Sequence, residues 1–377
     1  MDALITPLNW QRVRLGDILT LKHGRDYKNF KLGNIPVYGS GGYMLSINNF
    51  LHNGESVCIG RKGTIDKPIY LNGKFWVVDT LFYSYSFKKS IPKFIFYAFS
   101  IIKWSNYNEA TGVPSLTKMT ISNIEIPLPP LNEQIAIANI LSALDNYLHA
   151  LDSLILKKES VKKALSFELL SQRKRLKGFN QAWQRVRLGT YKYRRGSFPQ
   201  PYGNPQWYSD NGMPFVQVYD VGENFKLTQR TKQKISKIAQ PMSVFVPKNS
   251  VIITLQGTIG RVALTQYDCY CDRTILIFDN NTLNDVNKYF FVLSLFTKFE
   301  EEKRKADGSI IKTITKQTLK DFEIPLPPLN EQSAIADILS TLDKEIASLK
   351  NKKRQFENIK KALNHDLMSA KIRVLKK

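Results

Sequence analysis

Cysteine is scarce in this chain, and that scarcity excludes one class of protein. Among 377 residues there are three cysteines, Cys58, Cys269 and Cys271. They are too few and too close for the disulfide framework of a small secreted domain. Cys269-x-Cys271 lacks the spacing of a zinc knuckle, and no second Cys or His pair lies nearby in the sequence. We therefore expect a reducing, cytoplasmic setting and no metal site.

Long hydrophobic runs are also missing. The longest apolar stretches, such as residues 94–102, fall far short of the roughly 20 residues that a membrane span needs. The chain starts acidic and runs into Pro7 and Asn9, with no basic region before an apolar core. We expect no signal peptide and no membrane partner.

Motifs that carry chemistry are absent as well. There is no G-x-x-x-x-G-K-[ST] phosphate loop, and the GSGG run at residues 39–42 lacks the spacing of a dinucleotide site. No Asn/Asp-Pro-Pro-aromatic tetrapeptide of an amino-methyltransferase occurs, and none of the four histidines pairs with another at ligand spacing. Residues 301–303 contain a nuclease-like E-x-K, but a charge run at a helix end is far commoner. The sequence predicts no catalytic centre and no cofactor.

Positive charge is abundant. The chain has 55 Lys+Arg against 32 Asp+Glu, a formal net charge of +23, and 43% of its residues are hydrophobic. Such a composition can bury a core, so wholesale disorder is excluded. The excess of positive charge favours a polyanionic partner, above all nucleic acid. The alternative is a basic surface that has no particular partner.

A repeat covers the whole chain. Residues 124–145 read IEIPLPPLNEQIAIANILSALD and residues 322–343 read FEIPLPPLNEQSAIADILSTLD, with 18 of 22 positions identical. The heptapeptide WQRVRLG occurs at residues 10–16 and again at 183–189. The offset between the copies rises from 173 to 198 residues, so the second copy has 25 more, mostly between its WQRVRLG and its glycine turn at residue 257. The period is far longer than that of a solenoid, which indicates a domain duplication.

A long helix follows each PLPPLNEQ segment. Seven of nine positions at alternating steps of three and four are apolar in each copy, as in the seam of a coiled coil. The other seam positions are Lys158, Lys162, Lys353 and Lys360, and further Lys and Glu residues lie outside the seam. No Pro or Gly interrupts residues 131–177, which predicts a helix of roughly 65 Å with Asn132 and Asn330 as caps. The alternative is two unrelated surface helices, each packed on its own domain. The seam residues that we predict to form the spacer or dock a partner are Leu141, Leu144, Leu148, Leu151, Leu339, Leu342, Ile346 and Leu349.

The regions before these helices are of mixed type. Strand-like runs at residues 56–59, 75–78, 250–254 and 274–278 are separated by Gly, Asn and Pro turns, and residues 91–104 and 286–299 predict short buried helices. We predict an α+β protein with globular domains at 1–128 and 179–326 and long helices at 129–178 and 327–377. These four segments have net charges of +7, +8, +3 and +5 in that order. Both globular domains are thus candidates for a nucleic-acid surface.

Basic and polar residues recur around tight turns. Residues 60–65 (GRKGTI) and 254–261 (TLQGTIGR) each follow a predicted strand, where glycine lets a phosphate approach the backbone and the polar side chains supply donors. The loops after WQRVRLG differ most between the copies, which implies two different base sequences if both domains contact bases. A conformational turn with solvated charges is the alternative for any one residue. The predicted DNA contacts are Lys22, Arg25, Tyr27, Arg61, Lys62, Thr64, Ser115, Lys118, Arg194, Arg195, Ser197, Gln217, Gln256, Thr258, Arg261, Arg273, Lys312 and Lys316.

The whole chain resembles the specificity (S) subunit of type I restriction–modification systems. The IEIPLPPLNEQ and FEIPLPPLNEQ segments, the glycine turns at 56–65 and 250–261, and the IPVYGSGGY run at 35–43 carry this resemblance. It implies two target-recognition domains, each with a twisted mixed β-sheet, separated by two long antiparallel helices and related by a pseudo-twofold. Each domain would recognise one half of a bipartite double-stranded DNA site.

The resemblance also implies partners. Two modification (methyltransferase) subunits that bind S-adenosylmethionine would dock on the helices, and restriction (translocase/nuclease) subunits would join them, while the S subunit itself does no chemistry. Two alternatives remain: a self-contained nuclease or methyltransferase with a degenerate motif, and a standalone DNA-binding protein or decoy that occupies modification subunits.

Overall fold

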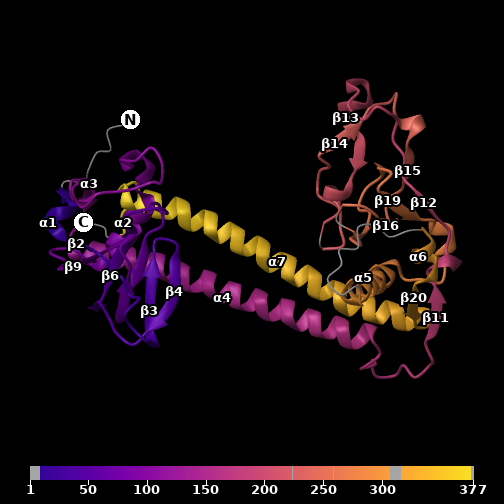
Figure 1. Ribbon diagram of the computed structural model, residues 1–377, viewed down its shortest axis with the longest axis horizontal. Helices are drawn as coiled ribbons and strands as arrows, with labels where there is room; N and C mark the ends of the chain where they lie inside the picture. Colours follow the sequence, from indigo (N-terminus) through magenta and orange to yellow (C-terminus); the bar gives the residue numbers. More distant parts are fainter. Residues whose placement is uncertain (1–8, 223, 258, 306–315, 375–377) are drawn as a thin grey trace. The chain divides into compact units, whose positions relative to one another are not determined.

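Two long helices run through both halves of the protein in a computed structural model, which describes residues 9–374 except 223, 258 and 306–315. The helices are α4 (Leu131–Leu170) and α7 (Leu329–Met368). The chain divides into two compact units, residues 1–154 with 350–377 (unit 1) and residues 155–349 (unit 2). Each unit thus combines a globular α+β part with one half of each long helix (Figure 1).

Unit 1 has two four-stranded sheets. The first has the order β2-β9-β6-β7 and the second the order β4-β3-β8-β5, with a parallel β3–β8 pair and all other pairs antiparallel. The predicted strands at 56–59 and 75–78 are confirmed as β6 and β8. The strands are β2 (Thr20–His23), β3 (Leu32–Gly39), β4 (Gly42–Ile47), β5 (His52–Asn53), β6 (Ser56–Gly60), β7 (Ile69–Leu71), β8 (Lys74–Val77) and β9 (Leu81–Tyr85).

Unit 2 repeats this topology strand for strand. Its sheets have the orders β12-β19-β16-β17 and β14-β13-β18-β15, and the β13–β18 pair is again parallel. The predicted strands at 250–254 and 274–278 are confirmed as β16 and β19. The strands are β12 (Tyr193–Arg195), β13 (Tyr208–Val216), β14 (Gln233–Ile235), β15 (Val244–Val246), β16 (Val251–Thr254), β17 (Val262–Leu264), β18 (Cys269–Cys271) and β19 (Ile275–Phe278).

The two repeated motifs that flank each globular part pair with each other. The QRVR of the first WQRVRLG is β1 (Gln11–Arg14), and it pairs with β10 (Glu125–Leu128), the EIPL that precedes α4. In unit 2, β11 (Gln184–Arg187) and β20 (Glu323–Leu326) pair in the same register. The next residues, Leu15 and Leu188, are fully buried. This two-stranded ribbon therefore closes each globular part next to the start of its long helix.

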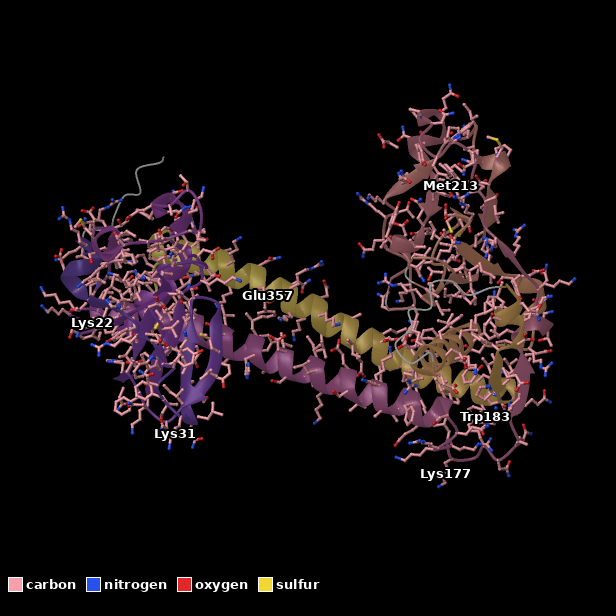
Figure 2. All side chains as sticks on the ribbon, viewed as in Figure 1. Lys22, Lys31, Lys177, Trp183, Met213 and Glu357 are labelled. Atoms are coloured by element: carbon pink, nitrogen blue, oxygen red, sulfur yellow. The ribbon has the colours of Figure 1, made fainter. Side chains whose placement is uncertain are left out.

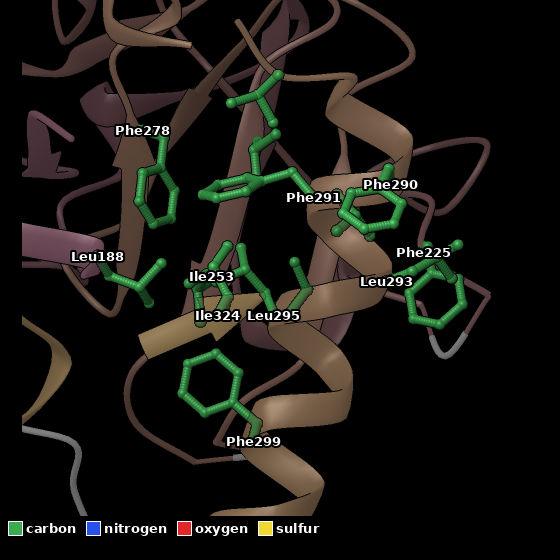
Figure 3. Close-up of a cluster of buried hydrophobic side chains, with 14 of the residues drawn as sticks. Leu188, Phe225, Ile253, Phe278, Phe290, Phe291, Leu293, Leu295, Phe299 and Ile324 are labelled. Atoms are coloured by element: carbon green, nitrogen blue, oxygen red, sulfur yellow. The ribbon is translucent and has the colours of Figure 1, made fainter. Parts of the chain in front are cut away.

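Short helices cover one sheet in each unit. The predicted buried helices are confirmed as α2 (Pro92–Ile101) and α5 (Lys288–Lys305), and smaller helices α1 (Leu15–Ile18), α3 (Lys118–Ser122) and α6 (Lys316–Asp321) stand beside the ribbons. Figure 3 shows the unit 2 core, where Phe291 of α5 lies beside Phe278 of β19 with the ring centres 5.2 Å apart, and Phe290 lies on another side of α5. No helix among the described residues combines the length and apolar character that a membrane span requires.

The long helices are antiparallel, and one ion pair between them, Asp145–Lys360 in unit 1 and Asp343–Lys162 in unit 2, occupies equivalent positions. In unit 1, Asp145 pairs with Lys360 and Asp152 with Lys353 at 2.6 Å. In unit 2, Lys158 pairs with Glu345 at 2.6 Å and Lys162 pairs with Asp343. Lysines at four seam positions therefore contact carboxylates on the opposite helix. These pairs fix the register of the two helices within each unit.

Both long helices are shorter than the sequence predicts, at 40 residues each, or about 60 Å. α4 ends at Leu170 although no Pro or Gly precedes Lys177. The chain leaves the helix through a left-handed residue, Gln172 (φ 61°), and α7 ends in the same way at Ala370 (φ 58°). These residues can adopt this conformation because the returning chain is held by new contacts, described below.

Candidate nucleic-acid interface and helical joints

One buried glutamate in each unit, Glu133 in unit 1 and Glu331 in unit 2, connects three separate segments of the chain. Glu133, the third residue of α4, is buried, and its carboxylate accepts hydrogen bonds from Trp10 Nε1 (3.1 Å) and from Arg373 Nε (2.7 Å) and Nη2 (3.0 Å). Trp10 begins the WQRVRLG motif, and Arg373 lies just beyond the end of α7. Glu133 therefore joins the globular part, its own helix and the end of the opposite helix. A carboxylate in the first turn of a helix also stabilises its positive N-terminal end.

The same joint recurs in unit 2. Glu331 accepts hydrogen bonds from Trp183 Nε1 (3.0 Å) and from Arg175 Nε (3.1 Å) and Nη2 (2.6 Å). Arg175 follows the end of α4, as Arg373 follows the end of α7. We call these two sets, Trp10–Glu133–Arg373 and Trp183–Glu331–Arg175, the joints.

The neighbouring Asn and Gln of each PLPPLNEQ segment are also engaged. The predicted caps Asn132 and Asn330 are wrong in position, because each is the second residue of its helix and its side chain accepts a hydrogen bond from the next backbone N–H at 2.9 Å. Gln134 is buried, and its Nε2 donates to the Pro129 carbonyl at 2.8 Å while its Oε1 accepts from Ile91 N at 3.0 Å. The Gln side chain thus ties the start of α4 to the start of α2.

A second repeated cluster lies 12 residues further along each long helix, at Asp145 of α4 and Asp343 of α7. Tyr97 of α2 donates to Asp145 at 2.7 Å while Lys360 pairs with the same carboxylate, and in unit 2 Tyr289 of α5 donates to Asp343, which pairs with Lys162. Burial, and then the hydrogen bond to a carboxylate, raise the pKa of both tyrosines. Both phenols therefore remain protonated donors. The cluster fastens each globular part to both long helices.

The seam residues lie between the helices rather than on an outer surface. Leu141, Leu151, Leu339 and Ile346 are buried, and Leu144, Leu148, Leu342 and Leu349 are half-buried. This placement fits a spacer. It leaves other apolar residues of the helices exposed, and three pairs of them occupy equivalent positions in the two copies: Leu131 and Leu329, Ile140 and Ile338, and Val161 and Ile359.

In unit 1 the structure brings several predicted DNA contacts together. The turn after β6 holds Arg61, Lys62 and Thr64, and Lys62 forms a β-bridge with Ser115. The bridge is flanked by hydrogen bonds from Gly63 N to the Pro114 carbonyl (2.8 Å) and from Leu116 N to the Arg61 carbonyl (2.9 Å). Lys118 starts α3 three residues beyond Ser115. Glycine is required at residue 60, because a Cβ there would lie 2.0 Å from the Thr64 carbonyl oxygen.

The other predicted contacts of unit 1 are less uniform. Lys22 is exposed on β2 with its Nζ 4.9 Å from the centre of the Tyr85 ring, and Figure 2 shows it at the surface. Arg25 is exposed, but its backbone is held by Val77 and by Trp76 Nε1. Tyr27 is half-buried against the small core that contains Trp76. It anchors its loop, so the prediction that its ring contacts DNA is not favoured by its packing.

In unit 2 several predicted contacts are engaged within the protein. Arg194 Nη2 donates to the Phe245 carbonyl at 3.1 Å, and Ser197 Oγ donates to the Met242 carbonyl at 3.1 Å, while Arg195 is exposed. The Arg273 guanidinium lies 5.3 Å from the centre of the Tyr202 ring. Thr258 and Lys312 lie outside the described residues, and for Lys316 only its place at the start of α6 is described.

Gln217, Gln256 and Arg261 meet around one connection. Arg261 Nη1 donates to the Val221 carbonyl at 3.1 Å, and Gly257, next to the exposed Gln256, packs against Val218. The Gln217 backbone N–H bonds to Asp220 at 2.9 Å. All of these contacts involve the chain between β13 and β14.

That connection is the feature that sequence reasoning missed. It spans residues 217–232, 16 residues, where the equivalent β3–β4 turn of unit 1 has two, Ser40 and Gly41. The prediction that the loops after WQRVRLG differ most concerns their sequence and stays a prediction. In length, β12 to β13 differs by only a few residues from β2 to β3, and the extra residues expected before the second glycine turn include this connection. A signal was present in the composition: residues 224–267 contain seven Lys+Arg and no Asp or Glu.

Among the described residues no group of three or more His, Cys, Asp or Glu side chains could hold a metal ion. The three cysteines are buried and free. Burial raises the pKa of the Cys58 thiol to about 12, which opposes the reactive thiolate.

Comparisons with known proteins agree with this architecture. The family model for the type I restriction modification DNA specificity domain matches residues 7–159 and 200–358. The chain is 26% identical to the type I restriction enzyme MjaVIII specificity subunit of Methanocaldococcus jannaschii, over 99% of this chain and 95% of that one. It is 26% identical to a putative specificity subunit of Haemophilus influenzae, with 82% and 80% covered.

Solved structures share the fold. The S subunit of a type I restriction–modification system from M. genitalium aligns with a TM-score of 0.69 at 16% identity, covering 96% of each chain. A structure described as showing complex assembly and conformational transition of the type I system aligns with a TM-score of 0.58 at 18% identity, covering 96% and 98%. With two copies of one globular part on a shared antiparallel helix pair, and with both copies matched by the family model, the chain belongs to the specificity subunits of type I restriction–modification systems.

Proposed function

We propose that this chain recognises a bipartite double-stranded DNA site, one half with the globular part of each unit. The observation that carries the proposal is that the two units share strand order and register but differ in their loops. One frame that presents different side chains, such as the Arg61–Lys62 turn in unit 1 and the 217–232 connection in unit 2, suits two different base sequences. Net charges of +7 and +8 on the two globular segments favour contact with phosphates in both halves.

The helix pair is proposed to set the spacer between the half-sites. α4 and α7 are each 40 residues long, and ion pairs with lysines at seam positions fix their register. The proposal includes two modification subunits, one docked on each unit. Its support is the matched exposure of Ile140 and Ile338 and of the other equivalent apolar residues of the helices. Restriction subunits would join through these partners, and the chain itself would do no chemistry and bind no cofactor.

Mapping of methylated bases tests the proposal. The chain is expressed with its modification subunits in a host that lacks other methyltransferases, and the genome is sequenced for methyladenine. We expect one bipartite motif, and we expect exchange of residues 179–326 for another recognition domain to change one half of it only. A continuous motif, or a change in both halves, would refute the assignment of one half-site to each unit. Co-purification with modification subunits but no methylation would instead identify a decoy.

A further inference from the structure

Unit 2 has a basic segment around β14, whereas the equivalent strand of unit 1, β4, and the turn before it contain no Lys or Arg. Residues 226–237 read KLTQRTKQKISK and contain five basic residues and no acidic one: Lys226, Arg230, Lys232, Lys234 and Lys237. All five are exposed. We call residues 226–237 the basic segment. It covers the end of the 217–232 connection, β14 and the first residues beyond it.

The basic segment is held in a fixed conformation by the protein itself. Asp220 is buried, and its carboxylate accepts hydrogen bonds from Gln217 N (2.9 Å), Lys232 N (3.0 Å) and Thr228 Oγ1 (3.4 Å). Three positions of the connection are thereby tied to one side chain. Burial nevertheless raises the pKa of Asp220 above its ordinary value. A buried carboxylate is costly, so its presence here indicates that the conformation of this connection matters.

Apolar anchors fix the same connection to the core. Val221 and Leu227 are buried in the core cluster that contains Ile252 and Ala263. Phe225 is buried in the main core of unit 2 beside α5, as Figure 3 shows, with its ring 5.1 Å from that of Phe296. Arg261 and the backbone of Leu264 also hold this connection, through the carbonyls of Val221 and Phe225.

The cations of the basic segment lie at the surface, where Lys234 Nζ donates to the Asp210 carbonyl at 2.7 Å and Lys232 Nζ lies 5.2 Å from the centre of the Tyr219 ring. Arg230, Lys232 and Lys234 occupy alternate positions, while Thr231 and Gln233 between them are half-buried and Ile235 is buried. Within β14 this alternation places Lys234 on the face opposite Gln233 and Ile235, while Arg230 and Lys232 lie in the bends that precede the strand. Figure 1 shows β13 and β14 at the end of unit 2 away from β11, β20 and the start of α7. The basic segment therefore does not belong to the helix pair or to the joints.

We propose that the basic segment is a contact surface for the phosphate backbone of duplex DNA, which unit 2 has and unit 1 lacks. The inference rests on the proposed function and assigns to that function a particular surface. Cations on a backbone that is already ordered lose little backbone entropy on binding, and lysine and arginine are the usual partners of phosphate oxygens. Phosphate contacts position a protein on DNA without specifying sequence. The basic segment would therefore strengthen binding by unit 2 whatever half-site that unit recognises.

The test measures how binding depends on salt. The full-length chain, alone and with its modification subunits, is titrated with a 40-base-pair duplex by fluorescence anisotropy between 50 and 300 mM KCl. The variant is Arg230→Gln/Lys232→Gln/Lys234→Gln. The matched control is Lys157→Gln/Lys163→Gln/Lys344→Gln, which removes three exposed lysines of the same unit from α4 and α7. A charge-preserving variant, Arg230→Lys/Lys232→Arg/Lys234→Arg, retains all three cations.

The expected result is specific to the basic segment. If all three cations contact phosphates, the slope of log K against log [KCl] becomes shallower by about 2.7, at about 0.9 for each contact. The control and the charge-preserving variant should keep the parental slope, and the loss should be equal for duplexes of different sequence. Equal slopes for the triple variant and its control would overturn the inference and leave the proposed function intact. Failure of the parental chain to bind duplex in either form would instead overturn the proposed function.

Discussion

Deletion of one heptad from each long helix should shorten the DNA spacer, if the helix pair sets it. The antiparallel register places residues 150–156 of α4 opposite residues 349–355 of α7. Asp152 and Lys353, which pair at 2.6 Å, are removed together. The deletion leaves Asp145 with Lys360 and Lys162 with Asp343. It also keeps the step of the apolar seam, although Glu357 loses its 3.5 Å ion pair with Lys353.

The magnitude follows from helix geometry. Seven residues at 1.5 Å each shorten the pair by about 10 Å, which is about three base pairs at 3.4 Å. A heptad turns a straight helix by only about 20° from its starting orientation. Three base pairs turn the duplex by about 100°, since one turn takes 10–10.5 base pairs. We therefore expect modification to be slower than in the parent but to occur at a site whose spacer is three base pairs shorter.

The assay is methylome sequencing of a host that expresses the deletant with its modification subunits. Both half-sites should be unchanged. A spacer of the original length would refute the reasoning. Deletion of residues 150–156 alone serves as the control, because it shifts Lys162 by about 10 Å relative to Asp343 and should abolish modification.

Four further outcomes are expected. Arg61→Ala should weaken binding only to the half-site of unit 1. Arg261→Ala should weaken binding only to the half-site of unit 2, because Arg261 holds the 217–232 connection. Half-site-specific binding assays check both predictions, and an equal loss at both half-sites would contradict them. Glu331→Ala should destabilise unit 2 by about 3 kcal/mol, because it leaves the partly buried guanidinium of Arg175 unpaired. Hydrogen exchange in the first turn of α7 measures this loss, and unchanged protection there would count against the prediction. Ile140→Lys should reduce the bound modification subunits from two to one in native mass spectrometry, and an unchanged stoichiometry would exclude Ile140 from the docking surface. No thiol should react with a disulfide reagent until the chain unfolds, because all three cysteines are buried; rapid reaction of the folded chain would disagree.

The joints illustrate that a repeat can be found from the sequence, whereas the partners of its side chains are found only from the structure. The match of 18 positions in 22 identified the duplicated segment without any structure. The Glu of that segment, expected only to face the positive end of its helix, in fact binds a tryptophan and an arginine from distant parts of the chain. No spacing in the sequence relates Trp10 to Arg373. Their common partner became apparent only when the two helices were seen to be antiparallel.

The connection between β13 and β14 gives the converse case. The connection is 14 residues longer than its counterpart in unit 1, and residues 224–267, which begin within it, contain no acidic residue; both facts follow from the chain, but the glycine turns predicted the phosphate contacts elsewhere. Arg261 belongs to such a turn, and the structure engages it with Val221 inside the protein. Arg230 and Lys232 are exposed, whereas Arg261 is half-buried. Sequence periodicity cannot predict this difference, because the residues lie in irregular segments.

The sequence by itself determined the duplication, the α+β class, most of the strands, the two long helices and the family resemblance. These features depend on repeats and on periodicities of two and of three to four residues, which are local properties of the chain. Tertiary structure alone decided where α4 and α7 end, how WQRVR pairs with EIPL, and what Glu133 and Glu331 hold. It also decided which cations are exposed at the surface. Such features depend on contacts between residues more than a hundred positions apart, and the free energy of those contacts exceeds local preference at Gln172 and Ala370.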